Sequence, residues 1–168
     1  ALPTGMSLTS TGRISGTPTA TPGSYTAVIQ ARDSNLCVGT RSYTITVTCP
    51  VVSISPVTLP NARQFQFYTQ SLTATGGNPA YTWSLDGTTL PAGLTLSAAG
   101  VLSGTATATP GTYSFRAKVT DSFNCSATRN YSIVFDCPLI SVIPTTLPPA
   151  TTTQPYSQQL SAAGGTAP

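Results

Sequence analysis

The sequence predicts an all-β protein made of tandem β-sandwich repeats of 88 residues, arranged as an extended rod. Residues 90–121, LPAGLTLSAAGVLSGTATATPGTYSFRAKVTD, follow the pattern of LPTGMSLTSTGRISGTPTATPGSYTAVIQARD at 2–33, at an offset of 88 with no gap. Over the whole chain, 36 of the 80 residue pairs at this offset are identical. Between turn signals the polarity alternates with period two, which indicates strands with one buried face.

The period divides the chain into three parts. Residues 1–50 are the C-terminal part of a repeat, residues 51–138 are a complete repeat, and residues 139–168 are the N-terminal part of the next. Because the chain begins in mid-repeat, we expect a fragment or processed product of something longer. Two readings stay open: a segment of a continuous array, which we favour, or a subunit whose C-terminal part completes the N-terminal part of the next copy.

The composition supports a turn-rich β protein and argues against several partners. Apolar residues make up 39% and charged residues 7%, which is too apolar and too uncharged for a disordered tract. The net charge is +3, but the seven basic residues are scattered, so we expect no nucleic-acid partner. No apolar run is long enough for a membrane span. Nothing in the sequence indicates a cofactor.

The first part of the chain contains a predicted long hairpin. Short strands are predicted around 2–8 and 12–16, and Pro22-Gly23 closes a loop. Alternation then predicts paired strands over 25–32 and 43–47, with Tyr25, Ala27, Ile29 and Ala31 on the buried face. Cys49-Pro50 ends the hairpin, because proline cannot continue a ladder.

The complete repeat contains an opening strand at 51–54, an irregular crossing segment at 56–63 and strands at 67–75 and 81–85. Two long strands follow, and their predicted buried residues are Tyr113, Phe115, Ala117, Val119, Tyr131, Ile133 and Phe135. About seven short strands with turn signals every 8–12 residues favour a two-sheet sandwich of immunoglobulin type. Trp83 on the third strand fits that plan. In the third part, 139–142 and 156–165 repeat 51–54 and 68–77.

The pattern LPxGLxL…GxLxGT…PGxYxFxxxVTD resembles the Ig-like repeats that occur in tandem in large bacterial surface and secreted proteins. The resemblance covers the whole chain. It implies a role as a spacer, stalk, adhesin arm or appendage of a surface enzyme, because the fold alone does not define a function. The Cys and Cys-Pro positions are additional to this motif.

Four cysteines, at positions that recur with the 88-residue period, predict disulfides and an oxidising compartment. We therefore expect an extracellular or cell-surface location. Cys125 lies in the loop between the last two strands, and Cys137 lies at the end of the final strand. A regular hairpin would separate them by about 30 Å, too far for a bond within one repeat. In an Ig-type sandwich that loop lies where the preceding repeat ends, so we predict Cys49–Cys125. Cys37 and Cys137 would then pair with neighbouring repeats or with copies of the chain, end to end.

The sequence offers few residues for catalysis or for metal binding. There is no histidine and no glutamate, so we predict no catalytic site and no zinc site, and we expect no enzyme. Asp33 and Asp121 end strands, where calcium could bind, but we favour hydrogen bonds to their own turns. Phe65, Phe67 and Phe123 could stack on a glycan, although packing at the ends of the repeat is the favoured reading.

We therefore expect a structural segment of an extracellular fibre, stalk or filament, with tandem Ig-like domains joined by disulfides between repeats. The alternative is a carbohydrate- or protein-binding adhesin module, or a spacer attached to a surface enzyme, with a host surface or glycan as its ligand. Contacts between chains would favour the first reading. A cleft lined by aromatic side chains and convergent polar groups would favour the second.

Overall fold

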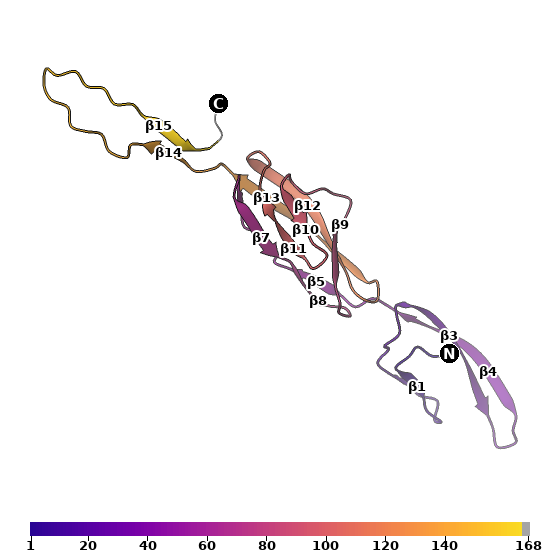
Figure 1. Cartoon of the computed structure of the whole chain (residues 1–168). Coiled ribbons are helices and arrows are strands. Elements are labelled where there is room, and N and C mark those ends of the chain that lie inside the picture. Colours follow the sequence, from indigo (N-terminus) through magenta and orange to yellow (C-terminus); the bar gives the residue numbers. More distant parts are fainter. Residues whose placement is uncertain (166–168) are drawn as a thin grey trace. The chain divides into compact units, whose positions relative to one another are not determined.

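The structure is a computed structural model of the chain and describes residues 1–165. In this range all regular secondary structure is β, in fifteen strands with no helix (Figure 1). The strands are β1 (Met6–Leu8), β2 (Ile14–Gly16), β3 (Gly23–Arg32), β4 (Val38–Val47), β5 (Val52–Ser55), β6 (Ala62–Arg63), β7 (Phe67–Ser71), β8 (Thr73–Gly76), β9 (Thr82–Leu85), β10 (Leu94–Leu96), β11 (Val101–Thr105), β12 (Gly111–Thr120), β13 (Ser126–Asp136), β14 (Ile140–Ile143) and β15 (Ser161–Gly164).

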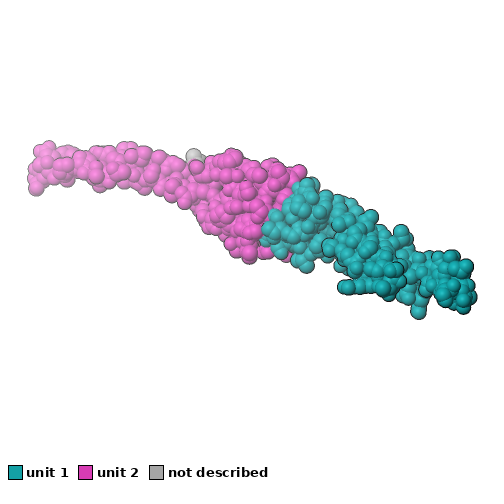
Figure 2. Space-filling view, turned by 90° about the horizontal axis from the view of Figure 1, so that it is seen from below, with its two compact units in different colours: residues 1–54, 74–82, 119–127 teal, residues 55–73, 83–118, 128–168 magenta. Residues whose placement is uncertain are grey.

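The chain divides into two compact units, coloured separately in Figure 2. Unit 1 consists of residues 1–54, 74–82 and 119–127. Unit 2 consists of residues 55–73, 83–118 and 128–168, of which the last three lie outside the described residues. Each unit therefore draws on segments that are distant in the sequence, and each is described by itself below.

Unit 1 contains two hairpins from the first 50 residues. β1 pairs with β2, and β3 pairs with β4 along ten residues, from Gly23↔Val47 to Arg32↔Val38. The predicted buried face of β3 is only partly buried: Ala27 is buried, but Ala31 is exposed. The prediction for Ala31 was wrong because β3 and β4 form a sheet of two strands, without the further strands that flank β12.

Unit 2 holds most of a two-sheet immunoglobulin-like core. One sheet has the order β10-β11-β7, and the other has the order β6-β13-β12-β9. Leu102 and Ile133 are 0% exposed, Trp83 is 5% exposed, and the rings of Phe115 and Tyr131 lie 5.6 Å apart. The alternating residues of β12 and β13 in this unit are buried as predicted at Phe115, Ala117, Tyr131, Ile133 and Phe135. The all-β, immunoglobulin-like class is confirmed.

Two local predictions were wrong. The strand predicted over 67–75 is interrupted at Leu72, so β7 pairs with β11 whereas β8 pairs with β5. The Leu72 side chain is 3% exposed and its N–H donates to the Gly100 carbonyl at 2.8 Å. The segment expected to be irregular contains β6, which pairs in parallel with β13 at Phe135↔Ala62 and Asp136↔Arg63.

The last part of unit 2 is a hairpin of β14 and β15, in register from Ile140↔Gly164 to Ile143↔Ser161. It repeats a contact of the complete repeat: the Tyr156 hydroxyl donates to the Pro148 carbonyl at 3.1 Å, as Tyr68 does to Pro60 at 3.2 Å. The positions of Tyr68 and Tyr156 are 88 residues apart. Tyr68 is 6% exposed and Tyr156 is 46% exposed, so the same side chain lacks a cover in the second hairpin.

A candidate covalent junction between repeats

Cys49 and Cys125 form a disulfide within unit 1. Their Cα atoms lie 5.6 Å apart, inside the range that a disulfide requires, and 76 residues separate them in the sequence. Cys49 precedes Pro50 at the end of the first hairpin and is exposed, whereas Cys125 is 2% exposed. The bond therefore joins the two sides of the Cys49-Pro50 boundary a second time.

Asp121 builds the turn that presents Cys125. One carboxylate oxygen accepts hydrogen bonds from the backbone N–H groups of Phe123 at 2.9 Å and Cys125 at 2.8 Å. The Asp121 N–H donates to the Cys125 carbonyl at 2.9 Å, which closes the five-residue turn. Asn124 adopts the left-handed conformation at φ 61°, which asparagine tolerates better than most residues. Asp121 thus bonds its own turn, as we predicted over calcium ligation.

The second oxygen of Asp121 reaches another loop of unit 1. It accepts the N–H of Asn78 at 2.8 Å, and the Ser122 N–H donates to the Asn78 carbonyl at 3.1 Å. Asp121 is only 4% exposed. The backbone hydrogen bond from Asn78, with smaller contributions from those of Cys125 and Phe123, holds the pKa of Asp121 below its ordinary value, against the opposing effect of burial. The ionised carboxylate therefore fixes the cysteine turn to the Asn78 loop.

Two glycines precede Asn78, and each allows a close approach of another segment. Gly76 and Gly77 have φ of +80° and +66°, a conformation that side chains rarely adopt. A Cβ on Gly76 would collide with the Val51 carbonyl, and one on Gly77 would lie 2.7 Å from the second Asp121 oxygen. The absence of a side chain at Gly77 thus leaves space for the Asp121 carboxylate, and its absence at Gly76 allows the close approach of the Val51 backbone.

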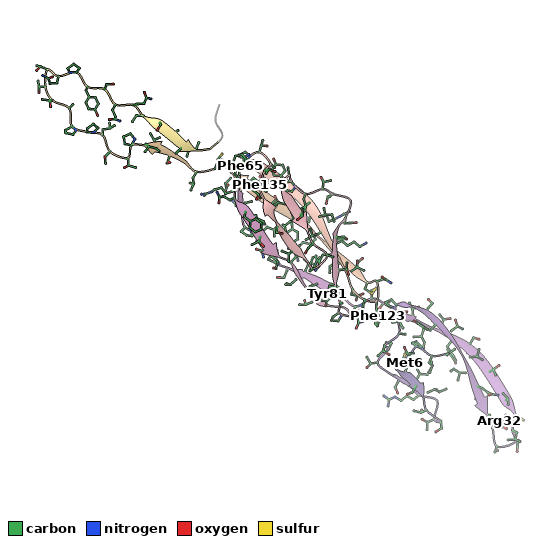
Figure 3. The ribbon with its side chains drawn as sticks, viewed as in Figure 1. Met6, Arg32, Phe65, Tyr81, Phe123 and Phe135 are labelled. Atoms are coloured by element: carbon green, nitrogen blue, oxygen red, sulfur yellow. A yellow bond between two sulfur atoms is a disulfide. The ribbon has the colours of Figure 1, made fainter. Side chains whose placement is uncertain are left out.

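Phe123, which is labelled in Figure 3, lies in the middle of the turn and lines a hollow of about 180 Å³ in unit 1. Residues of the first hairpin and of the preceding loop line the rest of it: Pro18, Ala20, Pro22, Val47, Thr48, Cys49 and Pro50. This placement agrees with packing at the end of the repeat. Phe65 lines a different hollow in unit 2, and Phe67 is 71% exposed. The hollow that Phe65 lines does not include Phe67 in its lining.

The remaining cysteines are free and exposed within the described part of the chain. Cys37 nevertheless lies in a turn like that of Cys125. Its N–H donates to the Asp33 carboxylate at 2.8 Å, and the Asp33 N–H donates to the Cys37 carbonyl at 3.0 Å. Leu36 has φ 66°, where Asn124 has 61°. Among residues 1–165 neither free cysteine has a partner, and their predicted pairing stays a prediction.

Within residues 1–165, no group of three His, Cys, Asp or Glu side chains is placed to hold a metal ion. The same range contains no helix long and apolar enough to cross a membrane.

The fold and the junction define an immunoglobulin-like module, and comparison with known families agrees. The chain belongs to the family described as "Putative Ig domain", whose matches cover residues 1–48 and 50–136. These matches meet at Cys49, the cysteine that the disulfide joins to Cys125. No curated protein matches the chain.

Two kinds of solved structure resemble the chain. One is a putative alpha-galactosidase from Bacteroides fragilis NCTC 9343, with 22% identity and a TM-score of 0.42 over 52% of this chain and 18% of that one. Another is the extracellular cadherin domains 1–4 of protocadherin gamma B7, with 13% identity and a TM-score of 0.43 over 95% of this chain and 46% of that one. The chain thus spans less than half the length of either structure.

Proposed function

We propose that this chain is a structural segment of an extracellular fibre, stalk or filament, in which tandem Ig-like domains are joined by disulfides between repeats. The observation that carries the proposal is the Cys49–Cys125 bond across the Cys49-Pro50 boundary. Membership of an Ig-like family supports a modular structural role. A disulfide further supports an oxidising, extracellular compartment.

The position of the bond in the sequence supports a tensile role. Between Cys37 and Cys137, the covalent path through the bond uses only β4 and β13 with their flanking residues. The 76-residue separation between Cys49 and Cys125 is bypassed. Tension applied along the chain would therefore pass through one long strand per repeat, and the rest of the sandwich would be shielded from it.

The adhesin alternative lacks an observation of comparable weight. The hollow lined by Thr88, Ser114, Phe115, Arg116 and Asn130 has a volume of about 320 Å³ and is widely open. Phe115 is 2% exposed, so it offers no face for stacking against a sugar ring. Arg116 is held by Asp86 at 2.7 Å. A ligand-binding cleft needs convergent polar groups with accessible apolar surface, and this hollow offers few of them.

Non-reducing peptide mass spectrometry tests the proposal. The intact chain is alkylated without reduction and digested, and the cross-linked peptides are identified. The proposal requires a peptide with Cys49 joined to one with Cys125, and alkylated Cys37 and Cys137 in freshly prepared monomer. Free thiols at all four positions, or a bond within one repeat such as Cys125–Cys137, would overturn it and return attention to the adhesin alternative.

A further inference from the structure

Unit 2 contains a hollow of about 410 Å³ whose lining includes the residue that follows Cys137 in the sequence. It is lined by Pro138 and Leu139, by Gly164 and Gly165 of the last hairpin, and by the loop at 63–66, which contains Arg63 and Phe65. Phe65, labelled in Figure 3, is 46% exposed and Leu139 is 72% exposed. The hollow therefore offers apolar surface and one cation, and the free cysteine Cys137 directly precedes its lining residue Pro138 in the sequence.

Four residues that line this hollow have counterparts 88 residues earlier in the sequence, where Asp121 occupies the adjacent space. Pro138, Leu139, Gly164 and Gly165 correspond to Pro50, Val51, Gly76 and Gly77. The backbone is the same: Gly164 and Gly165 have φ of +82° and +71°, and a Cβ on Gly164 would collide with the Leu139 carbonyl as one on Gly76 would with Val51.

One neighbour differs between the two sets of residues. A Cβ on Gly77 would meet both the Val52 side chain and the Asp121 carboxylate. Of the residues that the structure describes, one on Gly165 would meet only Ile140, the counterpart of Val52. The place that Asp121 occupies in unit 1 is open in unit 2 among the described residues. The position that corresponds to Asn78 lies outside the described residues.

Corresponding apolar side chains are buried in the complete repeat and exposed in the last hairpin. Ile54 is 5% exposed and Leu72 is 3% exposed in the complete repeat. Their counterparts in the last hairpin, Val142 and Leu160, are 60% and 49% exposed. Burying such side chains is worth about 25 cal/mol per Å² of apolar surface, so this face gains free energy from a β cover. The complete repeat contains a long hairpin of β12 and β13, which ends in the Asp121–Cys125 turn.

A hairpin of the same kind is free on this chain. β3 and β4 end in the turn from Asp33 to Cys37, which already has hydrogen bonds like those of the Asp121–Cys125 turn. Tyr43 on β4 is 46% exposed, whereas its counterpart Tyr131 is 3% exposed. The Asp33 carboxylate and the Arg63 guanidinium that lines the hollow have opposite charges, which favours their approach.

We propose that the hollow lined by Pro138 is a seat for an Asp-x-x-x-Cys turn of another repeat, and that the Asp33–Cys37 turn of a second copy of this chain fits it. The inference rests on the proposed function and names the segment that continues the fibre. Cys37 of the second copy then bonds Cys137. The two thiols lose two protons and two electrons, and a disulfide oxidant such as oxidised glutathione takes them up and becomes two molecules of reduced glutathione.

The test uses two full-length variants that each keep Cys49 and Cys125. The acceptor carries Cys37→Ser and retains Cys137, and the donor carries Cys137→Ser and retains Cys37. One of them is labelled with ¹⁵N, the two are mixed in equal amounts in a glutathione redox buffer, and covalent dimers are counted by intact mass. Random thiol pairing gives about twice as many mixed dimers as either homodimer. The seat is expected to raise this ratio to at least about tenfold, which corresponds to a preference of the order of 1 kcal/mol.

Controls separate seating from simple thiol reactivity. In denaturant the ratio should return to about two. In the donor, Asp33→Asn removes the charge but keeps an oxygen for the Cys37 N–H, and is expected to lower the ratio, whereas Ser34→Ala at the neighbouring exposed position should leave it unchanged. A statistical ratio in native buffer overturns the seat. If the Cys49–Cys125 peptide is intact in that sample, the proposed function survives; if that peptide is missing, the proposed function fails by its own test.

Discussion

The tensile path from Cys37 to Cys137 gives a length that can be measured. The sequence between these cysteines spans 100 residue steps, but the path through the disulfide uses 12 steps from Cys37 to Cys49 and 12 from Cys125 to Cys137. At about 3.6 Å per extended residue, the unbridged chain reaches about 360 Å, whereas the bridged path reaches about 90 Å. About 270 Å of contour length should therefore remain unextended while the disulfide is intact.

The two free thiols are suitable attachment points for a single-molecule pulling experiment. DNA handles are attached to Cys37 and Cys137 through maleimide thioethers, which reductants do not cleave, and the chain is stretched in an optical trap. The oxidised chain should stop extending at about 90 Å of protein contour, and addition of dithiothreitol should release about 270 Å more.

A variant with Cys49→Ser and Cys125→Ser is the matched control. It should show the full contour length before reductant is added and no change afterwards. If the oxidised parent chain extends to about 360 Å, or if reduction leaves its contour unchanged, tension does not pass through the disulfide and the tensile role is refuted.

Two further outcomes follow from the same junction. Reduction of Cys49–Cys125 is expected to lower the free energy of unfolding by up to about 4.5 kcal/mol, because the chain-entropy model assigns this value to a loop of about 76 residues. Urea titration with and without reductant measures this loss, and a loss near zero would contradict the model. Because the folded pKa of Asp121 is depressed, its contribution to stability is present above the ordinary pKa of 3.8 and is lost as pH falls through the lower folded value. Thermal unfolding should therefore show a decline of Tm in acid that is weaker in Asp121→Asn, and equal declines in parent and variant would contradict this.

Sequence patterns sufficed for the class of fold because the buried faces are encoded residue by residue. Alternation along 113–119 and 131–135 marks the side chains that the core needs, and the structure buries most of them. The break at Leu72 was not predictable in this way, because alternation continues across a strand that changes partners. β6 was not predicted for a related reason, because a parallel pairing of two residues leaves no periodic signal in the sequence.

The junction divides into a predictable part and a hidden part. The spacing of the cysteines, with the geometry of a sandwich, was enough to propose Cys49–Cys125, because a single regular strand cannot bring Cys125 and Cys137 together. The hydrogen bond from the Asn78 N–H to Asp121 was not predictable, because these residues are 43 positions apart and asparagine and aspartate are common in any turn. The signal that could have found it is the repeated Gly-Gly pair, since two consecutive glycines outside a flexible linker indicate a close backbone approach.

The occupied and free copies of the cysteine turn together indicate how such a junction could form. The Asp33 turn keeps its hydrogen bonds although Cys37 is bonded to no other residue in the described part of the chain, so the geometry that presents the thiol does not depend on the disulfide. A thiol presented in this way loses little additional freedom when the bond closes, and ordering costs are a main expense of association. The aspartate thus positions the cysteine first. The Gly-Gly pair and the apolar residues around it then determine which turn can pack there. Oxidation would then fix a contact that packing has already chosen, which is the order of events that a fibre needs to avoid bonding its repeats out of register.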